Sequence, residues 1–544
     1  MKAFKKYLVE FWNQRDTIKP KNGVKLSAYF FAVIVIYYTL EKVLLRLTTI
    51  PFNLYHNDHL FMALFKRLIS VNYIPIIFIL VVILFHKKLL ISWSHFEKGH
   101  TIRNLLFYIA CILTWLHTTH DFNFYFGQNY TLDRILLLLS LGLIYWKPVG
   151  TILFLFFLFP LVGQLEVLEG FSLSTTFLLT RIIILFIAFL SIHIAFKKFR
   201  FNHFMFMLGC FVASNYIVSG AGKIMLGEWI FNNQVNYLLP ATYANGWQSY
   251  LDIESLNSLT SFLNRFNLPS RIFSLLIECG MVSLFFNIKW ARILFIGSII
   301  MHLGIFFYSG IFFWMWILVL VGLLFIFSKK IIEPSTLFNK TFFLIAIPII
   351  LAGKFWINPS PKVWFDSPLN YTYKFKATLE NGEKHLLPPD FFAPYDVQFT
   401  FSNFKYLNKE PLLEIFWGAH ASKKLHNYLK TFHSTSDIFE YEKHQGKDYY
   451  DIEKKEFLKT FINQYISNWN QVKKSRNTIS YLRAPRILWN YPRKNFDLIG
   501  KTIKSIEVIE VTSYYSKQSG YKEIRNRTVL NMFISKENSL IEKE

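Results

Sequence analysis

The chain has 544 residues, of which 53% are apolar, 19% are aromatic and only 17% are charged, with a mean hydropathy of +0.29. Soluble domains carry about 45–50% apolar and about 25% charged residues, so this composition excludes an ordinary soluble protein and also a disordered one. Lys and Arg exceed Asp and Glu by 24. In a membrane protein such an excess is typical of cytoplasmic loops, and we therefore expect a membrane lipid environment and no nucleic-acid partner.

Apolar segments that approach the length of a bilayer span, about 20 residues, recur through the first 355 residues. They are Ser27–Leu47, Tyr73–Leu90, Leu105–Thr118, Ile135–Tyr145, Gly150–Gly163, Phe177–Phe196, Phe204–Gly222, Ile272–Phe286, Ala291–Tyr308, Ile311–Ser328 and Thr341–Phe355. The sequence thus predicts a polytopic α-helical bundle of about eleven spans. Little more than Lys147-Pro148 separates the fourth and fifth segments, which form either two tilted helices or one re-entrant pair.

The distribution of basic residues predicts the orientation. Residues 1–26 are rich in Lys, and alternate loops repeat this bias, which predicts a cytoplasmic N-terminus. With an odd number of spans, residues 356–544 lie on the outer side. Richness in Lys, Asn, Ile and Phe is typical of a bacterial sequence from an AT-rich genome. Helical spans indicate the inner, cytoplasmic membrane of such a host, since outer-membrane spans are typically β-barrels. The C-terminal domain would then be periplasmic.

The composition becomes polar after residue 355. Alternating apolar residues predict strands at Tyr371–Leu379 and Ser505–Ser513, and Asn381-Gly382 is a turn signal. Helical periodicity predicts helices at His420–Phe432 and Ile452–Val472. We therefore expect residues 356–544 to form an extracytoplasmic α+β domain, through which a protein substrate or partner would bind.

The longest external loop, from about Lys223 to Arg271, is rich in Trp and Tyr. Two interpretations stay open. The rings belong to an interfacial aromatic belt, the usual place for Trp and Tyr in membrane proteins, or the loop folds over the mouth of a cavity.

Several ionisable residues fall at bilayer depth, where they are costly and usually face a partner or a cavity. They are Glu41, Lys42, Arg46, Arg181, His193, Lys223, Glu278 and His302. Arg46, Arg181 and His193 lie near helix ends and are expected to snorkel. Glu278 and His302 have apolar neighbours on both sides and are either satisfied core residues or functional ones. Lys223 ends a span, where it either snorkels or, if desolvated, leaves a neutral amine that takes a proton.

The motif Tyr216-x-x-Ser219-Gly220-x-x-Lys223, followed by Trp229, resembles a known signature. It is similar to that of the vitamin K-dependent γ-carboxylase and its bacterial relatives, the HTTM (horizontally transferred transmembrane) domain family. Further matching stretches are Glu278-Cys-Gly, Arg292, His302-Leu-Gly and Gly310-Ile-Phe-Phe-Trp-Met-Trp316. The sequence departs from the carboxylase at Gly222, where that enzyme has a basic residue, and it has no cysteine outside the apolar segments.

This resemblance implies a function and a set of site residues. Lys223 would be the catalytic base that deprotonates a reduced quinone of the menaquinone or vitamin K type. Addition of oxygen then gives a strongly basic species that removes a proton from the γ-carbon of a Glu side chain, and carbon dioxide adds to the carbanion. His302 and Glu278 would be further catalytic residues that orient Lys223 or the quinone. Tyr216 and Trp229 would bind the cofactor, and no metal is implied.

Two other functions remain as alternatives. The chain could be a non-catalytic subunit or scaffold of a membrane complex, with a C-terminal domain that binds a protein partner. It could also be a lipid-linked glycosyl or acyl transferase, for which His56-Asn-Asp58-His59 and His120-Asp121 offer His and Asp in external loops.

Overall fold

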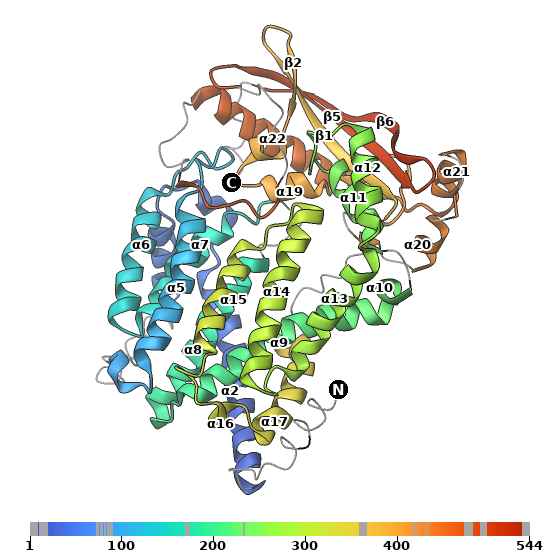
Figure 1. Cartoon of the computed structure of the whole chain (residues 1–544). Coiled ribbons are helices and arrows are strands. Elements are labelled where there is room, and N and C mark those ends of the chain that lie inside the picture. The colour runs from blue at the N-terminus through green and yellow to red at the C-terminus, as the bar shows by residue number, and fades with distance from the viewer. Residues whose placement is uncertain are drawn as a thin grey trace.

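The computed structural model describes residues 20–71, 91–168, 174–231, 234–357, 367–416, 435–472, 482–489 and 498–535, with short pieces at 419–420, 423–429 and 431–432 and single positions at 9, 76, 80 and 83. Helices form a bundle, and an antiparallel sheet with its own helices covers one end of it (Figure 1). Helix α2 begins at the opposite end of the bundle (Figure 1). The expected combination of a helical bundle with a C-terminal α+β region is confirmed.

The bundle contains long and short apolar helices. Four stretches are long and apolar enough to cross a membrane, namely Asn22–Thr48, Leu178–Phe196, Phe201–Met225 and Ile288–Ser309. They lie in α2 (Pro20–Thr48), α8 (Ser174–Phe196), α9 (Phe201–Leu226) and α14 (Ile288–Ser309). The other bundle helices are α3 (Leu60–Ser70), α5 (Gly99–Thr118), α6 (Thr131–Trp146), α7 (Gly150–Gly163), α13 (Asn267–Gly280), α15 (Trp314–Ile326), α16 (Pro334–Leu337), α17 (Lys340–Leu351) and α18 (Gly353–Trp356).

Some helix boundaries differ from the predicted ones. The predicted span Ile272–Phe286 is split, because α13 ends at Gly280 and a 3-10 turn follows over Met281–Ser283. The predicted span Thr341–Phe355 is divided between α17 and α18. Segments 135–145 and 150–163 belong to two separate helices, α6 and α7. Most of the predicted span Tyr73–Leu90 lies outside the described residues.

One charge pair lies between helices of the bundle. Arg181 Nε of α8 lies 2.6 Å from Glu41 Oε1 of α2, and Glu41 is buried. Arg181 therefore has a carboxylate partner within the bundle. The attraction between a guanidinium and a carboxylate at this distance explains why both charges are tolerated among apolar residues.

The C-terminal region is built on a four-stranded antiparallel sheet with the order β2-β1-β5-β6. Its strands are β1 (Leu369–Leu379), β2 (Lys384–Leu387), β5 (Ile503–Ser516) and β6 (Gly520–Phe533). Its other elements are η5 (Pro389–Phe392), α19 (Asp396–Phe401), η6 (Lys405–Leu407), β3 (Ile415–Phe416), β4 (Ala419–His420), α20 (Lys423–Leu429), α21 (Thr435–Gln445) and α22 (Ile452–Val472). The two predicted strands and the helix Ile452–Val472 are confirmed, and Gly382 takes the positive φ of +86° in the β1–β2 turn.

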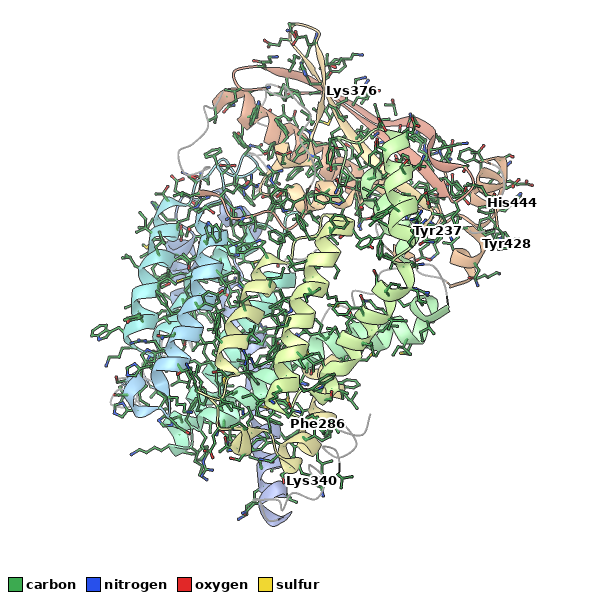
Figure 2. The ribbon with its side chains drawn as sticks, in the orientation of Figure 1. Tyr237, Phe286, Lys340, Lys376, Tyr428 and His444 are labelled. Atoms are coloured by element: carbon green, nitrogen blue, oxygen red, sulfur yellow. The ribbon has the colours of Figure 1, made fainter. Side chains whose placement is uncertain are left out.

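The loop that follows α9, which is rich in Trp and Tyr, packs between the bundle and the sheet (Figure 1). It forms α10 (Glu228–Phe231), η3 (Gln234–Tyr237), α11 (Leu238–Ala244) and α12 (Ile253–Asn264). Trp229 and Trp247 are buried, whereas Tyr250 is exposed. The Tyr237 and Tyr515 ring centroids lie 6.1 Å apart, and Figure 2 shows Tyr237 below the sheet, far from Phe286 and Lys340 near the other end. The loop therefore folds onto the rest of the protein, and both interpretations of its aromatic residues stay open.

Candidate functional site

Helix α9 carries two of the predicted site residues on one face. Tyr216 and Lys223 are seven residues apart, which is close to two helical turns and about 10 Å along the axis. Gly220, between them, lets α13 approach closely, because a Cβ at this position would lie 3.0 Å from Glu278 Cβ and from Cys279 Sγ. The small residues of the motif thus bring Glu278 next to the Lys223 side chain.

Lys223 and Glu278 form a buried ion pair. Lys223 Nζ donates a hydrogen bond to Glu278 Oε1 over 2.7 Å, and the two side chains are only 3% and 5% exposed. The other carboxylate oxygen of Glu278, Oε2, is buried and has no hydrogen-bond partner among the described residues. The pair therefore holds one unused acceptor beside a lysine that is shielded from solvent.

Trp229 covers the lysine from the other side. Helix α9 ends at Leu226, and Gly227 follows with a positive φ of +76°, where the chain turns into α10. This turn brings the Trp229 ring to 4.3 Å from Lys223 Nζ, a cation–π distance. Buried Arg271 of α13 donates hydrogen bonds of 3.3 Å to the carbonyls of Trp229 and Ile230, and so fixes α10 in place.

Tyr216 belongs to a second hydrogen-bonded cluster. Its hydroxyl lies 2.8 Å from His302 Nε2 on α14 and accepts a 2.9 Å bond from Trp316 Nε1 on α15. A hydroxyl has one proton and two lone pairs, so the direction of the Tyr216–His302 hydrogen bond depends on the tautomer of the His302 ring. The Phe313 ring packs edge-on to His302, with centroids 5.1 Å apart.

The Lys223–Glu278 cluster places a buried ammonium group between a carboxylate and an aromatic ring face. The carboxylate and the Trp229 ring both attract the positive charge of Nζ. The described residues contain no group of three or more His, Cys, Asp or Glu side chains arranged to hold a metal ion.

The structure brings all five predicted site residues into these two clusters. Lys223, Glu278 and Trp229 form the first, and Tyr216 and His302 belong to the second. Two further residues, Trp316 and Arg271, were not predicted as site residues. Trp316 was noted only as the end of a stretch that matches the family, and Arg271 only as a basic residue at the end of the aromatic loop.

One of the two motifs considered for a transferase, His120-Asp121, contributes a structural contact. Asp121 Oδ2 lies 3.4 Å from Arg483 Nη1, in segment 482–489 of the outer region. Nearby, Ala484 N–H donates to Thr119 Oγ1 over 3.1 Å. This aspartate therefore contributes to the attachment of the outer region to the end of α5.

Comparisons with protein-family models, with curated protein sequences and with solved structures find no match to this chain.

Proposed function

We propose that this chain is an integral membrane enzyme of the γ-carboxylase-like class, in which Lys223 acts as the base on the outer side of a bacterial inner membrane. The proposal includes about eleven spans, a cytoplasmic N-terminus and a periplasmic C-terminal domain. The four long apolar helices support a membrane location, and the alternation of basic loops in the sequence supports the orientation. The HTTM-like motifs support the reaction class.

One observation carries the proposal, namely the buried Lys223–Glu278 pair under the Trp229 ring. A solvent-exposed lysine is almost always protonated at neutral pH and is a poor base. A shielded lysine next to a carboxylate can pass its proton to that carboxylate and then accept one from a bound hydroxyl.

The residues present fit a hydroxyl-bearing aromatic ring such as a reduced quinone. Buried Glu278 Oε2 has no hydrogen-bond partner among the described residues, so it could accept a hydrogen bond from a hydroxyl of such a ring. When bound, the reduced quinone together with oxygen would supply the oxidation that drives carboxylation, and carbon dioxide would supply the new carboxylate. Lys223 would remove the quinone hydroxyl proton, and Glu278 would orient that hydroxyl. Tyr216 and His302 would stabilise the α9–α14 contact beside the site.

A pair-for-pair replacement tests the proposal. The full-length protein in lipid nanodiscs is supplied with chemically reduced menaquinone, oxygen, ¹⁴C-labelled bicarbonate and a Glu-rich peptide, and labelled peptide is counted. We expect Lys223→Met/Glu278→Gln to abolish incorporation while the protein remains folded, because both buried charges are removed together. The matched control is Arg181→Met/Glu41→Gln, which removes the other ion pair of the bundle and should retain activity. If Lys223→Met/Glu278→Gln incorporates as much label as the control variant and the unchanged protein, Lys223 is not the base.

The alternative function is a non-catalytic subunit of a membrane complex. It is favoured by the completeness of the contacts around Lys223 Nζ, since an ion pair and a ring face are also what a purely structural lysine needs. Complementation of a deletion strain distinguishes the two functions. Full complementation by Lys223→Met/Glu278→Gln would support the scaffold.

A further inference from the structure

A cavity of about 660 Å³ lies between the outer region and the loop that follows α7. Val167 and Leu168 of that loop line one side of it. The other sides are formed by side chains between residues 398 and 406, from α19 and η6, and by side chains between residues 449 and 457, at the start of α22. Cavities of about 300–1,000 Å³ are typical of small-molecule sites, so this one has a suitable size.

Among the described residues, the cavity is open to the outside. Phe457 of α22 lines it and is 41% exposed, and the exposed side chains of Asn403, Glu453 and Lys454 also line it. Phe404, in contrast, lines the cavity and is buried. A small molecule can therefore enter past exposed side chains and reach a buried ring.

Aromatic rings dominate the apolar part of the lining. Five rings contribute to it, namely those of Phe401, Phe404, Tyr406, Tyr449 and Phe457. The face of an aromatic ring is negative and attracts cations, and groups of such rings are a common way to bind organic ammonium ions. This lining favours a ligand with an apolar body, and a positive charge on the ligand adds to the attraction.

Two side chains that line the cavity have an unused oxygen atom. Gln398 Oε1 and the Tyr449 hydroxyl are buried and have no hydrogen-bond partner among the described residues. Because Gln398 Nε2 donates to the Leu165 carbonyl over 3.4 Å, the amide oxygen of Gln398 is fixed as an acceptor. The Tyr449 hydroxyl can accept as well, through its lone pairs. A ligand that satisfies these atoms carries hydrogen-bond donors.

The charged side chains of the lining also favour a cation. Asp451 and Glu453 contribute two carboxylates, and Lys454 contributes one ammonium group. Lys405 lines the cavity too, but its Nζ donates to two backbone carbonyls in segment 413–415. Burial lowers the pKa of Lys405 to about 7, so this side chain carries only part of a positive charge at neutral pH.

We propose that this cavity binds a small organic ammonium ion, that is, an amine with an apolar or aromatic body. The rings hold its body, and its N–H groups donate to Gln398 Oε1 and to the Tyr449 hydroxyl. The carboxylates of Asp451 and Glu453 attract its charge. The site lies in the outer region and does not depend on the chemistry of Lys223.

A pair of matched ligands tests the charge preference. Binding of 4-fluorobenzylammonium to the full-length protein in dodecyl maltoside is measured by ¹⁹F NMR, with protein-free micelles as the blank. The uncharged 4-fluorobenzyl alcohol has almost the same shape, and we expect it to bind at least about fivefold more weakly. Displacement of the ammonium probe by phosphatidylethanolamine but not by free ethanolamine would identify the natural amine as a lipid headgroup, and the reverse would identify it as a soluble amine.

A pair of matched variants tests the location. Phe457→Ala removes one ring of the lining and should weaken binding of the ammonium probe by about fivefold. The control is Ile452→Ala, on the same helix at a residue that is 53% exposed and does not line the cavity, and its binding should be unchanged. Gln398→Met should weaken binding of 4-fluorobenzylammonium but not of 4-fluorobenzyltrimethylammonium, which has no N–H group to donate.

Three results would overturn the proposal. They are the absence of saturable binding of the ammonium probe, equal affinities for the ammonium and the alcohol, and equal affinities of Phe457→Ala and Ile452→Ala. Lys223→Met/Glu278→Gln should bind the probe normally, so amine binding without carboxylation would refute the proposed function alone.

Discussion

The Lys223–Glu278 pair predicts an unequal response to loss of either partner. Lys223→Met leaves a buried carboxylate that has lost its one hydrogen-bond partner among the described residues, and removal of one member of a buried pair costs about 3–5 kcal/mol. Glu278→Gln leaves an ammonium that keeps the Trp229 ring at 4.3 Å, a contact worth about 0.5–2 kcal/mol, and an amide oxygen that still accepts a hydrogen bond. We therefore expect Glu278→Gln to be the milder change by about 1–2 kcal/mol.

The double variant completes a double-mutant cycle with these two single variants. Lys223→Met/Glu278→Gln removes both charges, so its free energy of unfolding should lie within about 1 kcal/mol of that of the unchanged protein. The coupling energy between the two positions should then exceed about 2 kcal/mol. The free energy of unfolding is measured by SDS titration of bicelle-reconstituted protein, with Trp fluorescence as the signal. Small, additive single effects would refute the reasoning, because they would mean that the pair is hydrated or open in the membrane-embedded protein.

Three further outcomes are expected from the same geometry. Gly220→Ala should destabilise the bundle by about 1–3 kcal/mol, because its Cβ would lie 3.0 Å from Glu278 Cβ. The control Gly304→Ala should be tolerated, because a Cβ there has nothing within 4 Å. Equal SDS-unfolding midpoints of the two variants would contradict the close contact at Gly220. Trp316→Phe should lower the free energy of unfolding by about 1–3 kcal/mol in the same titration, because the Tyr216 hydroxyl loses its indole donor. An unchanged free energy of unfolding would mean that this hydrogen bond is not formed. In the outer region, burial lowers the pKa of Lys405 to about 7, whereas an unfolded lysine titrates near 10.4. The unfolded chain therefore binds more protons between these values, so stability should rise with pH above about 7 by up to about 1.4 kcal/mol per unit, and Lys405→Met should remove this rise in urea melts.

The sequence predicted regular elements best where one periodicity ran without interruption. Helix α22 has the predicted bounds Ile452–Val472, and β1 and β5 contain the two predicted strands. The prediction was poorer for Ile272–Phe286, because apolar composition continues to Phe286 while the α-helix ends at Gly280. Composition therefore located the apolar segments but did not show where each helix turns.

The part of the site that lies on helix α9 could be predicted from the sequence, because its residues are close together along the chain. Small residues between Tyr216 and Lys223 are typical of close helix packing, and α13 approaches α9 closely at Gly220. Which side chains reach this part of α9 depends on tertiary packing, so the sequence did not show that Trp316 donates a hydrogen bond to Tyr216. Arg181 shows the same limit, since its partner Glu41 is 140 residues away in the sequence.

The end of α14 that lies towards the sheet packs against the loop that follows α9 (Figure 1). His302 lies on this helix, and the carbonyls of Phe307 and Tyr308 near its end accept hydrogen bonds from Trp247 Nε1 and Thr242 Oγ1 of the external loop, both over 3.2 Å. The next residue after the helix, Gly310, has a φ of +70°, and a Cβ there would lie 2.7 Å from the Trp247 ring.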